Sequence, residues 1–142
     1  MDIVELVAER IHNYYWDKDL NCATTTMQIL AEVFDFKILD QVYDAAIGMH
    51  GAAYYGAQCG LVEGGLMFIG MYGRNKKVPD KEIEACCQVF AAQFEERLSS
   101  LLCRELRPEG FHPDNPPHLC ENLTREAILF DIDYIKESFK GL

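Results

Sequence analysis

The chain has 142 residues and a formal net charge of −10, with 49% hydrophobic and 25% charged residues. This length suits one self-sufficient domain, predicted over residues 1–142, and the acidic charge argues against nucleic acid or anionic membrane as partners. The sequence after Met1 lacks the pattern of a secretion signal or a membrane span, so we expect a cytoplasmic protein.

Two amphipathic helices are predicted at the start of the chain. Apolar residues recur at helical spacing over residues 3–15, and Asp2 is placed to cap that helix. Asn21 is placed to cap a second helix that continues to about Phe34. Cys22 therefore falls in the first turn of the second helix, beside backbone N–H groups that have no partner within the helix.

A third helix is predicted over residues 38–47, before a stretch from Gly48 to Gly73 that holds eight of the ten glycines. A fourth helix is expected to begin near Cys59. Gly60 and Gly64 are one helical turn apart and give this helix a bare face, against which another helix or a flat cofactor is expected to lie. Both glycines are therefore candidate cofactor-binding residues.

Cys59 is the first candidate for chemistry. At the start of a helix, free N–H groups and the helix dipole favour a thiolate over a thiol, and the same argument applies to Cys22. Both are candidate catalytic residues. The alternative is that Cys59 is a small buried apolar side chain where two helices cross.

Other polar and aromatic groups lie near Cys59 in the sequence. His50 is the most interesting of the four histidines, although a lone loop histidine is usually a hydrogen-bonded side chain. Tyr54 and Tyr55 are placed to shield a cofactor or to pack, and Tyr55 is assigned to cofactor binding. Glu63 is a candidate proton carrier if it is buried, and has no such role on a helix surface.

The second half of the chain predicts two further helices. One begins at Pro79, and Cys87 belongs to its apolar stripe in the core. An unbroken helix would point Cys103 nearly opposite that stripe, so either the helix bends or ends near Leu102 or Cys103 serves a separate site. Residues 107–119, with four prolines and with His112 and His118, predict a loop. The last helix is predicted over residues 123–139, and Asp131 and Asp133 are expected on its solvent-exposed face. No strand pattern is present, which predicts an all-α, single-domain bundle of about six helices with a glycine-rich central helix.

Four of the six cysteines share a predicted position at a helix end or in a loop beside one, namely Cys22, Cys59, Cys103 and Cys120. No Cys-x-x-Cys pair occurs. Four sulphurs drawn together from distant segments suit an iron–sulphur cluster or zinc, so these four residues are the candidate metal ligands. The same residues also suit dithiol pairs that cycle with a disulfide.

The cysteine motifs resemble the C_GCAxxG_C_C family of redox-active four-cysteine proteins. Residues 21–23 (Asn-Cys-Ala) match its first element and residues 59–64 (Cys-Gly-Leu-Val-Glu-Gly) its central motif, with Leu61 in place of alanine. Residues 103–106 and Cys120 match the third and fourth elements. The chain is also similar to the cysteine-bearing part of split-Soret cytochromes, in which a four-cysteine iron–sulphur site accompanies haem in a homodimer.

The resemblance implies a redox role with a metal or iron–sulphur cofactor, [2Fe-2S] in the first place. The bare glycine face and aromatic residues such as Tyr14, Trp16 and Tyr54 favour a homodimer. Covalent haem is not expected, because no Cys-x-x-Cys-His occurs. Three hypotheses follow: an electron-transfer protein with an iron–sulphur cluster, a metal-free thiol–disulfide oxidoreductase or redox sensor, and a non-catalytic helical module with structural zinc. None of them identifies the redox partner.

Overall fold

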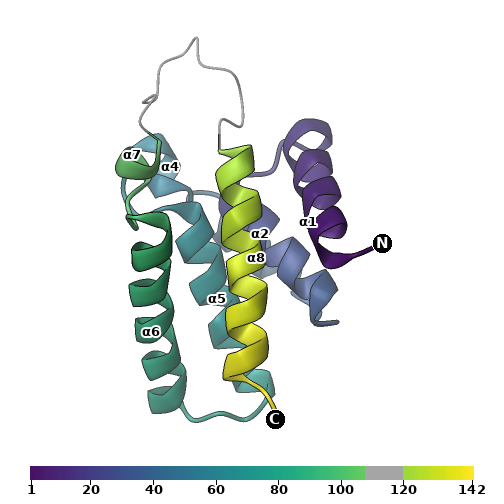
Figure 1. Cartoon of the computed structure of the whole chain (residues 1–142), viewed down its shortest axis with the longest axis vertical. Helices are drawn as coiled ribbons and strands as arrows, with labels where there is room; N and C mark the ends of the chain where they lie inside the picture. The colour runs from purple at the N-terminus through teal and green to yellow at the C-terminus, as the bar shows by residue number, and fades with distance from the viewer. Residues whose placement is uncertain (108–119) are drawn as a thin grey trace.

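Figure 1 shows a computed structural model of the chain, which describes residues 1–107 and 120–142. These residues form an all-α structure, as the sequence predicts, and contain no β-strand. Within this described part, no helix combines the length and the apolar character needed to cross a membrane. In chain order, the elements are α1 (Ile3–His12), the π-helical turn η1 (Asn13–Asp17), α2 (Cys22–Val33), α3 (Asp40–Ala45), α4 (Gly51–Tyr54), α5 (Gly60–Asn75), α6 (Asp80–Leu98), α7 (Cys103–Leu106) and α8 (Glu121–Ser138).

The first two helices begin at the capping residues that the sequence identifies. The Asp2 side chain accepts a hydrogen bond from the backbone N–H three residues later at 2.9 Å, and Asn21 accepts the equivalent bond at 2.8 Å. Each bond satisfies a donor that the helix itself leaves unpaired. The predicted helix over residues 3–15 is α1 as far as His12, after which the chain widens into η1.

A strained turn precedes the glycine-rich helix. The helix predicted over residues 38–47 is shorter, because α3 ends at Ala45, and the sequence pattern does not predict α4. In α4, Ala52, Ala53 and Tyr54 have φ angles of 53°, 55° and 68°. This left-handed conformation costs about 1–2 kcal/mol for each residue that has a Cβ atom, so surrounding contacts must hold the turn in place.

The long helix α6 ends well before Cys103. It stops at Leu98, where Ser99 takes a left-handed φ of 76°, and Cys103 begins the separate helix α7. The prediction that the helix bends or ends before Cys103 is therefore confirmed. The proline-rich loop predicted over residues 107–119 lies outside the described residues, apart from its first residue, and so do its two histidines.

Helix α5 lies at the centre of the bundle and packs against α2, α6 and α8 (Figure 1). Small residues bring the backbones close together. A Cβ atom on Gly64 would lie 2.7 Å from the carbonyl oxygen of Ala23, and one on Gly65 would lie 2.6 Å from the Phe90 ring. The largest fully buried side chains include Ile11, Met27, Leu30, Phe68, Phe90, Phe94 and Ile128.

One acidic residue is buried in this core. Asp131 on α8 is completely buried, which corrects the prediction of a solvated face, whereas Asp133 is exposed as expected. Neither carboxyl oxygen of Asp131 has a hydrogen-bond partner among the described residues. Burial raises the pKa of Asp131 well above its ordinary value, because a charged carboxylate is poorly solvated in an apolar core.

Candidate functional site

Four cysteines stand at the starts of four different helices. Cys22 is the first residue of α2 and Cys103 the first residue of α7, while Cys59 and Cys120 occupy the capping positions of α5 and α8. We refer to these four residues as the cysteine quartet. Figure 1 shows α4, α7 and the start of α8 at the same end of the bundle, which is how residues distant in the sequence come to share one region.

Backbone pairing joins Cys59 to Cys103. The N–H of Cys59 donates to the carbonyl oxygen of Leu101 at 2.8 Å, and the N–H of Cys103 donates to Ala57 at 2.8 Å. Between these two bonds, Gln58 and Leu102 form an isolated antiparallel bridge. The pairing fixes the two cysteine backbones beside each other, although 44 positions separate them in the sequence.

Cys22 reaches the same region through a glycine. A Cβ atom on Gly60 would lie 2.3 Å from the Cys22 Sγ atom, so the sulphur occupies the space that any other residue at position 60 would fill. The Asn21 amide holds this end of α2, because it donates to the carbonyl oxygens of Ala46 and Ile47 at 3.2 and 3.0 Å. The start of α2 is therefore tied both to α5 and to the chain that follows α3.

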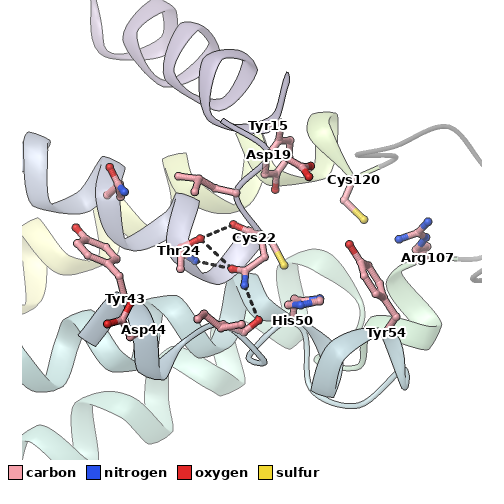
Figure 2. A pocket seen from close by; sticks show the side chains of 14 residues that line it. Tyr15, Asp19, Cys22, Thr24, Tyr43, Asp44, His50, Tyr54, Arg107 and Cys120 are labelled. Atoms are coloured by element: carbon pink, nitrogen blue, oxygen red, sulfur yellow. Dashed lines mark hydrogen bonds between the residues drawn. The ribbon is translucent and has the colours of Figure 1, made fainter. Parts of the chain in front are cut away.

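Two members of the quartet open on a cavity of about 490 Å³, whereas Cys59 and Cys103 are buried and do not line it. Cys22 and Cys120 both line it, and Figure 2 shows their sulphurs pointing into the space in front of His50 and Tyr54. The aromatic rings of Tyr15 and Tyr43 complete its walls, together with the polar side chains of Asp19, Asn21, Thr24, Gln28, Asp44 and Arg107. The cavity connects the thiols with the solvent.

The members of the quartet influence one another electrostatically. Cys22 is half-buried, and burial raises its pKa well above the ordinary value. Cys59, Cys120 and Cys103 each raise the pKa of Cys22 further, because a negative sulphur nearby opposes a second one. Negative charge on any of these three sulphurs therefore disfavours negative charge on Cys22.

The predicted thiolate at Cys59 is not supported. The backbone N–H groups of Leu61 and Val62 do lower its pKa, as the start of a helix should. Burial is the larger effect, and Cys103 and Cys120 add to it, so the pKa of Cys59 rises to about 12. The predicted position at the helix start is confirmed, and the predicted low pKa is wrong because the sulphur is shielded from water.

Some candidate residues lie apart from the cavity. The face of Gly64 is filled by the α2 backbone, so a helix lies against that glycine. Tyr55 is 77% exposed and does not line the cavity, whereas its neighbour Tyr54 does. Glu63 is only half-buried, and the Gln58 side chain donates a hydrogen bond to it. Cys86 and Cys87 pack half-buried against the core on α6.

The sequence does not reveal how α7 is docked. The N–H of Arg104 donates to the carbonyl oxygen of Gly56 at 3.3 Å, and its side-chain Nε donates to the same oxygen at 2.9 Å. The Arg104 guanidinium also lies over the Tyr55 ring, 5.9 Å from its centre, and Arg107 lies at the same distance over Tyr54. These contacts clamp the left-handed turn against the helix that carries Cys103.

Tyr15 is a further residue of the site that the sequence pattern assigns only to the core. Its hydroxyl forms a buried hydrogen bond of 2.7 Å with Thr124 of α8. Burial raises its pKa well above the ordinary value, and Cys22, Cys120 and Cys59 raise it too. Its position near three of the four cysteines depends on how η1 meets α8, which no local pattern shows.

Among the described residues, no group of three or more histidine, cysteine, aspartate or glutamate side chains is already arranged to hold a metal ion. The donor type nevertheless suits soft metals, because the quartet supplies four sulphurs. The described residues also show no disulfide among the cysteines.

Comparison with known proteins agrees with the cysteine pattern. A model of the C_GCAxxG_C_C family, described as a putative redox-active protein, matches residues 20–131. This range includes the whole quartet. No curated protein and no solved structure matches the chain. The chain belongs to the C_GCAxxG_C_C family of putative redox-active proteins.

Proposed function

We propose that the cysteine quartet is a redox centre that holds an iron–sulphur cluster and transfers electrons. The observation that carries this proposal is that the four cysteines begin four helices and are linked in space: backbone pairing joins Cys59 to Cys103, Cys22 packs against Gly60, and Cys120 lines the same cavity as Cys22. Cysteines that serve only as small core residues have no reason to share a neighbourhood or to occupy equivalent positions on four helices. Cys86 and Cys87 behave in that ordinary way.

The electrostatics favour metal ligation over free thiolates. Burial opposes a negative charge on Cys22 and on Cys59, and the neighbouring cysteines Cys103 and Cys120 oppose it further at both positions. A bound cation takes the place of the thiol protons and offsets this repulsion, which is why metal binding to cysteines releases protons. The buried quartet is therefore better suited to hold a metal than to present a reactive thiolate.

The residues fit an iron–sulphur cluster in donor type and in space. The missing Cβ atom of Gly60 gives the Cys22 sulphur its place, and the cavity that Cys22 and Cys120 line measures about 490 Å³. When bound, such a cluster supplies one-electron chemistry. Because no metal site is preformed in the described part of the chain, binding requires the cysteine side chains to turn toward a common point. The family resemblance favours [2Fe-2S], and zinc is the alternative ion for the same four ligands.

A metal-free dithiol centre is the second candidate. Cys22 and Cys59 are the candidate pair, because the Cys22 sulphur packs against Gly60, the residue that directly follows Cys59. Cys22 and Cys59 would then lose two protons and two electrons to an external acceptor and form a disulfide. The raised pKa of Cys59 makes this reaction slow at neutral pH, because the thiolate is the reacting form.

The test is anaerobic purification followed by reconstitution with iron and sulphide. We expect a coloured protein with visible charge-transfer absorption, and serine variants at each quartet position should lose most of the bound iron. Cys87→Ser is the matched control, because Cys87 is half-buried on α6 outside the quartet. Protein that stays colourless and iron-free after reconstitution contradicts the proposal, and bound zinc without iron or sulphide supports the structural alternative. A homodimer and an unidentified electron partner stay predictions.

A further inference from the structure

We infer that Tyr15 is a positioning residue that fixes Cys120 in the quartet, through a hydrogen bond to the hydroxyl group of Thr124. Its consequence for metal binding rests on the proposed function. Tyr15 and Cys120 line the same cavity. Tyr15 lies before residues 20–131, the part of the chain that the family model matches, so the family's cysteine pattern assigns it no role.

Cys120 is the member of the quartet that belongs to the start of α8. Contacts among α2, α5 and the residues just before α7 join the other three cysteines to one another. Cys120 occupies the capping position of α8, and its carbonyl oxygen accepts two hydrogen bonds of 2.7 Å from Thr124, one from the backbone N–H and one from the side-chain hydroxyl. The position of Cys120 is therefore tied to Thr124 and to the first turn of α8.

The Thr124 hydroxyl links this carbonyl oxygen to Tyr15. The two hydroxyl oxygens are 2.7 Å apart, and Thr124 is completely buried while Tyr15 is 2% exposed. A threonine hydroxyl has one proton, which goes to the Cys120 carbonyl oxygen, so Tyr15 donates and the Thr124 oxygen accepts. The result is a buried chain of two hydrogen bonds from Tyr15 to the backbone of Cys120, in which each bond polarises and strengthens the other.

The π-helical turn η1 places Tyr15 against α8. The turn is closed by a hydrogen bond of 3.2 Å from the N–H of Lys18 to the carbonyl oxygen of Asn13. Turns of this kind are rare and occur frequently at functional sites. The next side chain along η1 contacts the same part of α8, because the Trp16 Nε1 atom donates to the Glu121 carboxylate at 2.6 Å. Two adjacent aromatic residues therefore hold the first turn of α8.

Three substitutions separate the hydroxyl contacts from the rest of these side chains. Tyr15→Phe keeps the ring and removes the donor, Thr124→Val keeps the shape and removes both hydroxyl bonds, and Thr124→Ser keeps both bonds. The matched control is Tyr43→Phe, because Tyr43 lines the same cavity but belongs to α3. Circular dichroism establishes that each variant is folded.

Two measurements read out the position of Cys120. In the metal-free reduced protein, amide hydrogen exchange at position 124, relative to the unfolded chain, should be about tenfold faster in Tyr15→Phe and in Thr124→Val, the effect of losing a buried hydrogen bond. In anaerobic protein saturated with Co²⁺, the sulphur-to-cobalt charge-transfer absorption per bound ion should fall by about a quarter in both variants, because one of four sulphur ligands is lost. Thr124→Ser and Tyr43→Phe should match the wild type in both measurements.

The two measurements distinguish a failure of this inference from a failure of the proposed function. If the wild type binds neither cobalt nor iron, the proposed function fails and the exchange rates alone decide whether Tyr15 holds Cys120. Unchanged exchange in Tyr15→Phe overturns the inference. Faster exchange with an unchanged cobalt spectrum overturns it too, because the contact then stabilises α8 without placing the ligand sulphur. Should Tyr15→Phe fail to fold, Thr124→Val and Thr124→Ser give the same comparison.

Discussion

The sulphur of Cys22 and the backbone of Gly60 are packed so closely that no side chain fits between them. A Cβ atom at position 60 would lie 2.3 Å from the Cys22 Sγ atom and 2.9 Å from the carbonyl oxygen of Met49. The glycine is required by close approach, since its φ angle is not in the left-handed region. The junction of α2 and α5 therefore depends on the smallest residue standing next to a thiol.

Gly60→Ala should weaken both the fold and the quartet. We expect a loss of about 1–3 kcal/mol in the free energy of unfolding, typical of an overpacked core, together with reduced iron uptake because Cys22 is displaced. Urea unfolding and iron analysis measure the two effects. Gly70→Ala is the matched control within the same helix, because nothing lies within 4 Å of a Cβ atom there. It should gain about 0.5–1 kcal/mol, and a similar gain in Gly60→Ala contradicts the packing argument.

In the left-handed turn at α4, a substitution by glycine should stabilise the protein, whereas the replacement of Gly60 should destabilise it. Ala53 is exposed and has φ and ψ of 55°, a conformation that glycine adopts without strain. Ala53→Gly should therefore raise the free energy of unfolding by about 1 kcal/mol. Ala92→Gly, at an exposed position within α6, should lower it by about the same amount. Thermal unfolding measures both, and destabilisation in both variants contradicts the left-handed assignment.

The sequence predicts where helices begin better than it predicts how deeply the side chains at those positions are buried. Asn21 and Cys59 are recognisable as the starts of α2 and α5, because a capping residue or a change in glycine pattern precedes an apolar helix. The burial of the Cys59 side chain cannot be predicted from the sequence, because it depends on backbone pairing with residues 101–103, which are distant along the chain. The burial of Asp131 is not predicted for the same reason. The helical pattern of residues 123–139 does not show that Gly65 of α5 and Phe90 of α6 lie beside this carboxyl group.

Asp131 predicts a pH dependence of stability. Burial raises the folded-state pKa of this carboxyl well above its ordinary value of 3.8, so the folded protein holds the proton more tightly than the unfolded chain. The stabilising contribution is fully present below pH 3.8, declines as the pH rises, and is lost once the pH passes the folded-state pKa. Asp131→Asn should therefore remove this decline and be more stable than the wild type at pH 7.5.

The control for this prediction is two residues away. Asp133→Asn changes an exposed carboxylate on the same helix and should leave the pH profile of stability unchanged. Urea unfolding between pH 4 and pH 8 gives the free energy of unfolding for the three proteins. Parallel profiles for the wild type and Asp131→Asn contradict the assignment, because a carboxyl that titrates equally in both states adds no pH dependence.

The Cys59 thiol should react unusually slowly with alkylating reagents. Burial raises its pKa to about 12 against the helix-start N–H groups, so the thiolate fraction at pH 8 is roughly a thousandfold below that of an ordinary cysteine with a pKa near 8.5. Iodoacetamide labelling of the reduced metal-free protein, compared with N-acetylcysteine at the same pH, should show slowing of that order. The slowing should disappear in urea, because unfolding removes the burial that causes it. Labelling of folded Cys59 at the rate of N-acetylcysteine instead favours the thiol–disulfide function, since only an accessible, ionised sulphur reacts at that rate.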